Sequence, residues 1–148
     1  MKVAADHVRA RIRWVDALRS GRYTQFQGGL VDAEDYNNRC CLGVACDVRV
    51  SGIEFETEPT WDGYLLFKDV ISKEGGNPWE YTVIGVLPET AMRSLGFDTS
   101  NPIVAFAGDR KPLSWLNDNG HSFAEIADLI EQQYVEPHLH LLEDEDAL

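Results

Sequence analysis

The sequence has no long apolar run, few cysteines and few basic residues, and each shortage excludes a class of protein. No stretch approaches the roughly 18 consecutive apolar residues that a membrane-spanning helix requires. The opening segment MKVAADHVRARIRW carries charges throughout, so it lacks the apolar core of a secretory signal. We therefore expect a cytoplasmic protein with no membrane partner.

Cysteine is the next shortage. The chain of 148 residues has three cysteines, an odd number, and two of them are adjacent. A chain of this length can bury a hydrophobic core without covalent cross-links, so reduced thiols are expected in place of a disulfide framework. All three cysteines lie in the segment NNRCCLGVACD, where they lack the two-residue gap that is typical of zinc sites. We expect no metal site and no cofactor.

Basic residues are outnumbered by acidic ones, 13 against 25, which gives a formal net charge of −12 at pH 7. The imbalance is uneven, because residues 1–22 carry a net +4 and the rest of the chain carries −16. Such an acidic body repels phosphate backbones, which disfavours direct nucleic-acid binding, and it attracts basic protein surfaces. Solubility is the simpler explanation of the same charge. The arginines near the N-terminus are expected to pair with the chain's own excess carboxylates.

Helical periodicity is present near both ends of the chain. Apolar residues recur every three or four positions over residues 5–20 and again over residues 123–134, which predicts two amphipathic helices. Ser122 and Glu125 have the spacing of a capping box at the start of the second helix. Pro137 is expected to end that helix.

Between these helices the sequence favours strands. Residues 53–58 alternate apolar and acidic side chains, and residues 63–70 and 80–86 are rich in aromatic and β-branched ones, so antiparallel strands are predicted there. Strands and helices do not alternate regularly, which argues against a parallel α/β sheet. The predicted architecture is a single α+β domain over residues 1–137, with helices at both ends and a central cysteine helix on a small, mainly antiparallel sheet, followed by an acidic tail over residues 138–148.

The cysteine segment has two further interpretations. On a helix over residues 39–49, Cys41 shares one face with small apolar residues, and free cysteine is among the most buried residue types, so a packing face is favoured. A thiol at a helix N-terminus can also be a nucleophile, because the helix dipole lowers its pKa. In that alternative Cys41 (or Cys40) is the nucleophile, His121 the base and Asp118 the orienting group of a hydrolase or transferase. Little else matches a cysteine enzyme, so we favour a protein that is not an enzyme.

Aromatic residues supply candidates for a binding surface. Most tryptophans are core residues, but two of the four lie in the turn-like segments WDGY and GNPWEY, close to acidic residues. Tryptophan and tyrosine are enriched among the residues that anchor protein interfaces. The candidate partner-binding residues are Trp61, Trp79, Glu54, Glu56, Glu58 and Asp62.

Four segments, RWVDALRSGRYTQ, NRCCLGVACD, VLPETAMRSLGF and LSWLNDNGHSFAEIADLIE, resemble a group of small proteins encoded by bacteriophages and prophages. The group shares a Cys-Cys-Leu-Gly-Val core and an Asn-Asp…Ser-Phe-x-x-Ile-Ala ending, and the resemblance covers roughly residues 14–134. It implies a phage setting and no particular chemistry. The positions that carry it are Trp14, Ala17, Leu18, Ser20, Gly21, Tyr23, Cys40, Cys41, Leu42, Gly43, Val44, Asn117, Asp118, Ser122, Phe123, Ile126 and Ala127.

Three functions from different classes stay open. The favoured one is an acidic intracellular binding or inhibitory protein that covers a basic surface of a host protein, in counter-defence or by nucleic-acid mimicry. The second is the cysteine-dependent hydrolase or transferase with Cys41 and His121. The third is a protein that sequesters a small nucleotide in a pocket between the protomers of a homodimer, although no glycine-rich loop leads from a strand into a helix as a phosphate cradle requires.

Overall fold

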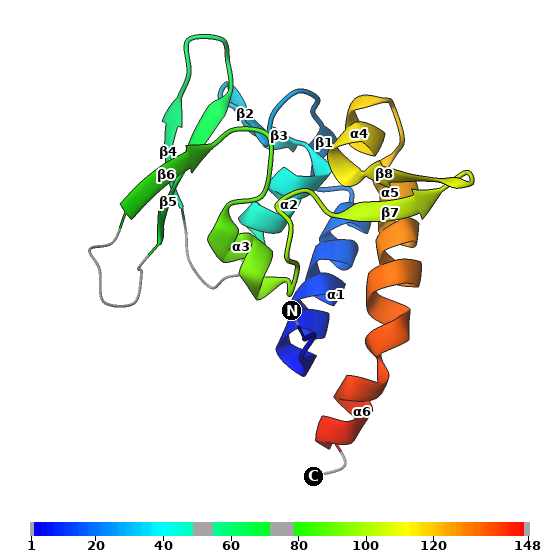
Figure 1. Cartoon of the computed structure of the whole chain (residues 1–148). Coiled ribbons are helices and arrows are strands. Elements are labelled where there is room, and N and C mark those ends of the chain that lie inside the picture. The colour runs from blue at the N-terminus through cyan, green and yellow to red at the C-terminus, as the bar shows by residue number, and fades with distance from the viewer. Residues whose placement is uncertain (1, 49–54, 72–78, 147–148) are drawn as a thin grey trace.

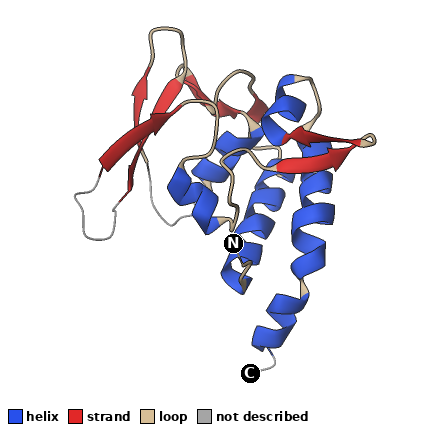
Figure 2. Ribbon diagram, viewed as in Figure 1, coloured by secondary structure: helices blue, strands red, loops and turns tan. Residues whose placement is uncertain are grey.

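Helices α1 and α5 run side by side, and a three-stranded sheet stands apart from them with helix α2 between (Figure 1). Figure 2 shows the strands toward the end of the molecule opposite the C-terminus. This is a computed structural model, and it describes residues 2–48, 55–71 and 79–146. In chain order the elements are α1 (Ala5–Arg19), β1 (Thr24–Gln25), β2 (Val31–Asp32), β3 (Asp35–Arg39), α2 (Cys41–Asp47), β4 (Glu56–Pro59), β5 (Leu65–Ile71), β6 (Trp79–Val83), α3 (Glu89–Ser94), β7 (Ile103–Phe106), β8 (Asp109–Pro112), α4 (Leu113–Asp118), α5 (Phe123–Ile130), the π-helix η1 (Glu131–Val135), the 3-10 helix η2 (Glu136–His138) and α6 (His140–Asp146).

Helix α1 buries the apolar stripe that its periodicity predicts. Val8 and Trp14 are fully buried and Leu18 is nearly so. The helix ends at Arg19, one residue before the predicted end, and Gly21 follows with φ +77°, a left-handed conformation that favours glycine and stops the helix. The N-terminal helix expected from the sequence is therefore confirmed to within one residue.

Arg11 differs from the expectation that the arginines of this helix pair with carboxylates. It is 2% exposed, and its guanidinium donates to the carbonyl oxygens of Leu95 at 2.7 Å, Gly96 at 3.2 Å and Tyr134 at 2.9 Å. It also lies 4.5 Å from the centre of the Phe97 ring. The first two carbonyls follow α3, where a helix end leaves backbone acceptors without partners. The buried cation therefore joins α1, α3 and η1.

Arg19 pairs with carboxylates as expected. Its guanidinium lies 2.6 Å from a carboxylate oxygen of Asp128 and 2.9 Å from one of Glu131. These ion pairs join the end of α1 to the end of α5 on the molecular surface, where each pair stabilises by roughly 1 kcal/mol at most.

The strands divide among three small sheets, where the sequence suggested one. β5 is the central strand of the antiparallel sheet β4–β5–β6, β7 and β8 form a hairpin, and β3 pairs in parallel with β1 and antiparallel with β2. Along β5, Leu65 and Phe67 are buried, whereas Leu66 and Lys68 on the opposite face are not. The α+β class and the mainly antiparallel pairing are confirmed.

Helix α2 lies at the centre and approaches the β1–β3–β2 sheet very closely. A Cβ on Gly43 would lie 2.0 Å from the carbonyl oxygen of Leu30, so this position requires glycine. The indole N–H of Trp14 donates to the carbonyl oxygen of Cys41 at 2.8 Å and ties α1 to α2. Cys40 caps the helix, since its Sγ accepts the N–H of Gly43 at 3.4 Å. All three cysteines are free and buried, as a packing face requires.

Beyond α5 the chain stays helical but changes its helix type. The π-helix η1 is followed by the 3-10 helix η2, which contains Pro137, and then by α6. Pro137 therefore lies within a change of helix type and does not end the helical segment. The segment expected to be an acidic tail forms α6 up to the last described residues, because Leu141 and Leu142 pack against the core.

The π-helix also covers the outer edge of β7. The side-chain amide of Gln133 accepts the N–H of Ala105 at 2.8 Å and donates to the carbonyl oxygen of Ala105 at 2.9 Å. The hydroxyl of Tyr134 donates to the carbonyl oxygen of Ile103. Consecutive side chains of η1 thus bind the backbone of β7 in the way a neighbouring strand would.

Candidate functional site

An exposed tryptophan stands at the tip of the β4–β5 hairpin. The side chain of Trp61 is 98% exposed. Its turn is held by backbone hydrogen bonds from Thr60 to Tyr64 at 2.8 Å and from Gly63 to Thr60 at 3.2 Å, and the Thr60 hydroxyl binds the carboxylate of Asp62. An ordered turn presents the large aromatic ring on a backbone that has little conformational entropy left to lose on binding.

Strand β4, which leads into this turn, is an exposed edge strand with acidic side chains. All four of its residues are exposed. Glu56 and Glu58 point to the same face of the sheet, because side chains alternate along a strand. A carboxylate oxygen of Glu58 lies 3.5 Å from Nζ of Lys68 on β5. An edge strand keeps a row of backbone N–H and C=O groups available to another chain.

The turn between β2 and β3 brings further acidic residues beside the β4–β5 turn. The N–H of Ala33 donates to the carbonyl oxygen of Gly63 at 2.9 Å, and Asp32 forms a β-bridge with Tyr64. The two turns therefore lie side by side. We call the shared surface the acidic hairpin surface; it consists of Asp32, Glu34, Asp35, Tyr36, Glu56, Glu58, Trp61 and Asp62.

This surface keeps a strong negative charge. Among the described residues, the ion pair on it is that of Glu58 with Lys68. The carboxylates of Asp32 and Asp35 accept backbone N–H groups two residues further on, at 2.9 and 3.0 Å. Such bonds orient the carboxylates without neutralising them. Tyr36, with 57% of its surface exposed, adds a second aromatic ring.

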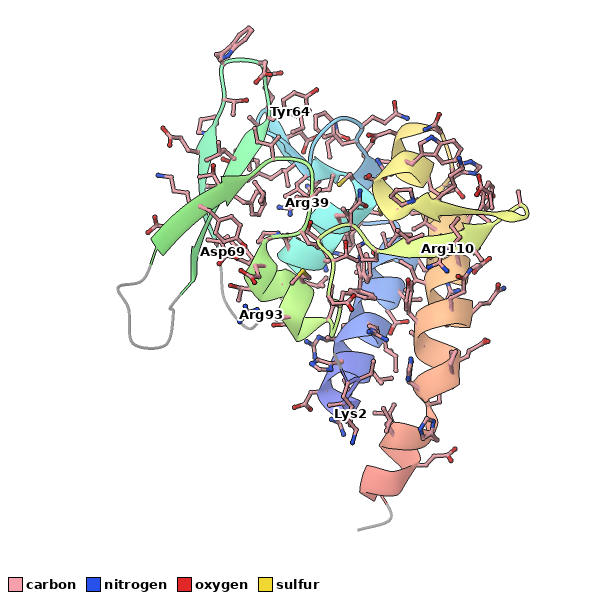
Figure 3. All side chains as sticks on the ribbon, viewed as in Figure 1. Lys2, Arg39, Tyr64, Asp69, Arg93 and Arg110 are labelled. Atoms are coloured by element: carbon pink, nitrogen blue, oxygen red, sulfur yellow. The ribbon has the colours of Figure 1, made fainter. Side chains whose placement is uncertain are left out.

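Tyr64 anchors the hairpin to the body of the protein (Figure 3). A Cβ on Gly29 would lie 2.5 Å from the Tyr64 ring, and one on Gly28 would lie 2.8 Å from its hydroxyl oxygen. Phe26 packs against the same ring with the centroids 5.6 Å apart. The two glycines therefore leave room for the Tyr64 ring, which anchors the turn that carries Trp61 to the core.

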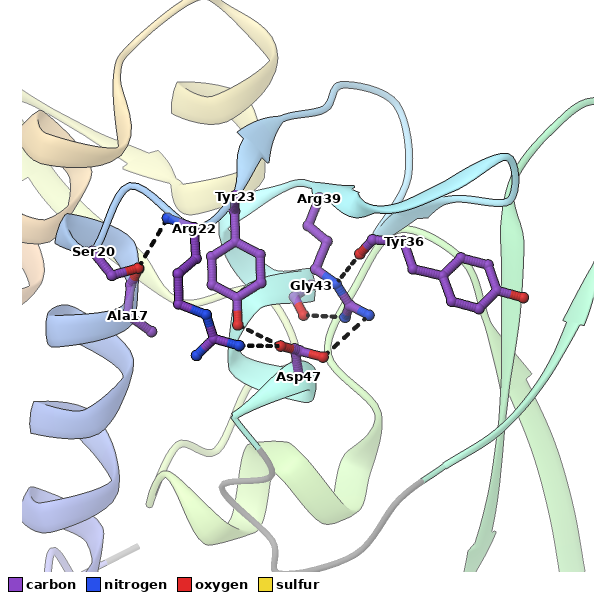
Figure 4. Close-up of polar contacts among 8 residues, drawn as sticks. All are labelled: Ala17, Ser20, Arg22, Tyr23, Tyr36, Arg39, Gly43 and Asp47. Atoms are coloured by element: carbon purple, nitrogen blue, oxygen red, sulfur yellow. Dashed lines mark hydrogen bonds and ion pairs between the residues drawn. The ribbon is translucent and has the colours of Figure 1, made fainter.

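A buried cation lies beneath Tyr36 and joins β3 to α2 (Figure 4). The guanidinium of Arg39 donates to the carbonyl oxygens of Tyr36 at 2.6 Å and Gly43 at 2.8 Å and lies 3.4 Å from a carboxylate oxygen of Asp47. The hydroxyl of Tyr23 donates to the other carboxylate oxygen. Burial, reinforced by Asp47, raises the pKa of Tyr23 to about 12. These contacts fix the backbone of Tyr36 and leave its ring exposed.

Several predicted binding residues lie on this surface, and others do not enter it. Glu54 and the side chain of Trp79 lie outside the described residues, although the backbone of Trp79 begins β6. Tyr36 and the acidic β2–β3 turn were missed by the sequence analysis, although the segment DAEDY places three carboxylates and an aromatic ring together. The predicted residues that the structure places on one hairpin are Glu56, Glu58, Trp61 and Asp62.

Cys41 and His121 are each engaged in structural contacts. Cys41 is fully buried, its Sγ lies 3.7 Å from the carbonyl oxygen of Leu113, and burial raises its pKa well above the ordinary value. His121 Nδ1 lies 2.9 Å from a carboxylate oxygen of Glu125, and its ring packs against Phe106 with the centroids 4.7 Å apart. A buried, protonated thiol is a poor nucleophile, so this geometry does not favour a cysteine hydrolase.

Asp118 belongs to a hydrogen-bond network around Asn117. The Oδ1 of this fully buried asparagine accepts the N–H of Cys41 and an amide N–H of Gln25, both at 3.0 Å. Its Nδ2 donates to the carbonyl oxygen of Phe26 at 2.6 Å and to Asp118 at 3.2 Å. Asn117 thus satisfies both donors and both acceptors. The Asn-Asp motif and the cysteine motif meet here, and their contact serves folding.

Other chemistries find little support in the described residues. No three histidine, cysteine, aspartate or glutamate side chains there converge on a point that could hold a metal ion. A cavity of about 420 Å³ beside α3 is lined by Glu89 and Asp98, and the described residues that line it include no basic side chain, which suits a nucleotide phosphate poorly. Within the same part of the chain, no helix has both the length and the apolar character to cross a bilayer.

The fold and this surface define an α+β protein with an acidic hairpin that ends in an exposed tryptophan. The chain belongs to the family described as Domain of unknown function (DUF8296), whose model matches residues 7–134. No curated protein and no solved structure matches the chain. The matched segment contains the whole acidic hairpin surface, whereas α6 lies beyond it.

Proposed function

We propose that this protein binds a partner protein with a basic surface through the acidic hairpin surface, and that the complex blocks that basic surface. The observation that carries the proposal is Trp61, which is 98% exposed in an ordered turn next to the carboxylate of Asp62. Such an aromatic residue is the usual anchor of an interface, and a rim of charge sets the orientation of the partner.

The physical argument has an electrostatic and an apolar part. The net charge of −12 attracts a basic partner and speeds its encounter, an effect that salt screens. Burying the ring of one tryptophan in an apolar pocket then contributes about 4 kcal/mol before the entropy of association is subtracted. Charge therefore supplies the steering, and Trp61 supplies much of the affinity.

The sequence resemblance implies a phage setting, and in that setting the partner would be a host protein. A basic surface that normally contacts nucleic acid is the fitting target, because the carboxylates of the acidic hairpin surface replace phosphates as its counter-charges. The protein would then act as an inhibitor in counter-defence, without chemistry of its own.

The test compares three forms of the immobilised protein in host-cell extract at 50 mM and 500 mM salt. The first is the wild type, the second carries Trp61→Ala, and the third carries Glu56→Gln, Glu58→Gln and Asp62→Asn. We expect the wild type to retain a basic protein at low salt, identified by mass spectrometry. The tryptophan variant is expected to bind that purified partner at least about tenfold more weakly, since an interface anchor contributes 2 kcal/mol or more.

A matched control neutralises three carboxylates elsewhere, by Asp16→Asn, Glu136→Gln and Glu143→Gln. These side chains are exposed on α1, η2 and α6, and none belongs to the acidic hairpin surface. The control variant should keep most of its affinity for the partner. It loses the same three negative charges as the hairpin variant, but from positions outside the acidic hairpin surface. Equal losses in the two triple variants, or unchanged binding in Trp61→Ala, would contradict the proposed surface.

A further inference from the structure

The cavity beside α3 is a recess between β6, α3 and the turn that follows α3. Its volume is about 420 Å³, within the range of ~300–1,000 Å³ that is common for ligand pockets. Val83, Val86 and Met92 contribute partly exposed apolar side chains to its lining. The recess therefore offers apolar surface that an aliphatic chain could cover.

Two carboxylates, Glu89 and Asp98, also line this recess. One oxygen of Glu89 lies 2.8 Å from Nη2 of Arg93, whose side chain is 60% exposed on the outer side of α3 (Figure 3). Asp98 is exposed and has no ion pair among the described residues. A cation can therefore bind Asp98 directly, and it competes with the exposed Arg93 for Glu89.

The walls of the recess are fixed by backbone contacts. The N–H of Leu87 donates to the carbonyl oxygen of Ser100 at 2.9 Å, and the N–H of Phe97 donates to the carbonyl oxygen of Met92 at 3.1 Å. Gly96 has φ +74°, which lets the chain turn sharply after α3 and brings the following residues back toward the recess. The apolar part and the carboxylates are therefore in place before a ligand arrives.

We propose that this recess receives a lysine or arginine side chain of the partner protein, an inference that rests on the proposed function. These side chains have an aliphatic stem and a cationic head, so the stem covers Val83, Val86 and Met92 while the head reaches Asp98 and Glu89. The charge of the recess is complementary to this occupant and opposed to an anionic one. Arg93 is the internal competitor, since it holds Glu89 until the partner's cation replaces it.

The test uses pentylammonium as a probe of the stem-and-cation chemistry. The chain has two methionines, so labelling with ¹³C-methyl methionine gives two methyl signals, and that of Met92 reports on the recess. We expect pentylammonium to shift the Met92 signal saturably, and 1-pentanol at the same concentration to bind at least about fivefold more weakly. Sodium chloride at matched ionic strength controls for screening.

Three substitutions that remove one charge each locate the cation. Asp98→Asn is expected to weaken pentylammonium at least about threefold, and Glu89→Gln to weaken it less. Arg93→Gln is expected to strengthen it about twofold, because it frees Glu89. Equal binding of pentylammonium and pentanol, or an unchanged affinity in Asp98→Asn, overturns the proposal.

The same variants separate this inference from the proposed function. If Asp98→Asn leaves the affinity for the purified partner unchanged while Trp61→Ala lowers it, the recess is not part of the interface and the proposed function stands. If pentylammonium binds as expected and Trp61→Ala has no effect on the partner, the recess recognises cations but the acidic hairpin surface is not the interface.

Discussion

Arg11, Asn117 and Asp69 are buried polar side chains, and each satisfies backbone groups at the end of a helix. Arg11 binds the carbonyls that follow α3, and Asn117 binds the first N–H of α2. Asp69 accepts the backbone N–H of Thr90 at 2.9 Å, the hydroxyl of Thr90 at 2.7 Å and the hydroxyl of Tyr81 at 2.9 Å, near the start of α3. Losing one of them would leave buried groups unsatisfied at roughly 1–3 kcal/mol each.

The three buried thiols predict a loss of stability at alkaline pH. Burial raises the pKa of Cys40 from its ordinary value of 9.0 to about 11, and it also raises the pKa values of Cys41 and Cys46. Between pH 9 and 11 the thiols of the unfolded chain lose their protons, whereas those of the folded chain keep them. The contribution of the thiols to the free energy of unfolding is therefore fully present below pH 9. Above pH 9 it falls by at most ~1.4 kcal/mol per pH unit for each thiol. Urea unfolding at pH 8, 9 and 10 measures the decline.

A single substitution tests whether the thiols cause that decline. Cys46→Ala removes one of the three groups, so its stability is expected to fall with pH about one third less steeply than that of the wild type. The buried thiols of the native protein should also react slowly with iodoacetamide at pH 8. A decline that is equally steep in both proteins would show that other groups are responsible.

Single residues also show where sequence patterns stop being informative. Burial of the cysteines follows from residue type alone, and the exposure of Trp61 is consistent with its turn-like neighbours Thr60 and Gly63. The burial of Arg11 could not be predicted, because its partners lie 84 to 123 positions away in the chain. Long-range contacts of this kind leave no local periodicity.

At the scale of elements, α2 approaches Leu30, the residue before β2, closely at Gly43. Alanine is favoured over glycine within a helix by about 1 kcal/mol, so helix propensity alone would make a Gly43→Ala variant more stable. The added Cβ would lie 2.0 Å from the carbonyl oxygen of Leu30, and a backbone atom cannot move aside as the end of a flexible side chain can. Overpacking at this position therefore outweighs the gain in helix propensity.

Gly43→Ala is expected to lower the free energy of unfolding by at least about 2 kcal/mol, because α2 must move away from the sheet. Urea unfolding monitored by circular dichroism measures the change. Gly85→Ala is the matched control, since a Cβ there meets no atom within 4 Å, and its effect should stay within about 0.5 kcal/mol. A Gly43 variant as stable as the Gly85 variant would contradict the close packing.

Elements were predicted well where they are long and poorly where they are short. The stripes of α1 and α5 are regular enough to fix both helices, and Ser122 caps α5 by accepting the N–H of Glu125, as its spacing suggested. β1 and β2 have two residues each, too few for a period to appear. The contact between the β2–β3 and β4–β5 turns is non-local, so the sequence could suggest Trp61 but not its acidic neighbours from the other hairpin.

At the scale of the whole molecule, excess negative charge opposes the compact state. The net charge is −12, and many carboxylates are exposed without an ion pair within the described residues. Repulsion among these carboxylates extends over a screening length of ~30 Å at 0.01 M salt and ~8 Å at 0.15 M salt. The surface ion pairs weaken under the same screening, but each contributes little.

The melting temperature at pH 7 is therefore expected to rise between 10 and 200 mM sodium chloride. Differential scanning calorimetry measures the shift. The variant with Glu56→Gln, Glu58→Gln and Asp62→Asn removes three negative charges, so it should melt higher than the wild type at 10 mM salt and gain less from added salt. A melting temperature that falls with salt would mean that ion pairs such as those of Arg19 dominate over repulsion.

The edge strands β7 and β4 differ in which side chains lie along them, and this decides which chains can extend each sheet. Gln133 occupies the edge of β7, which closes it to every other strand. Within the described residues no strand pairs with the outer edge of β4, which presents Glu56 and Glu58. A second copy of the chain aligned on this edge would place carboxylate against carboxylate, whereas a strand with lysines would meet opposite charges. The charges on β4 therefore disfavour pairing with a second copy of this chain and favour pairing with a basic strand.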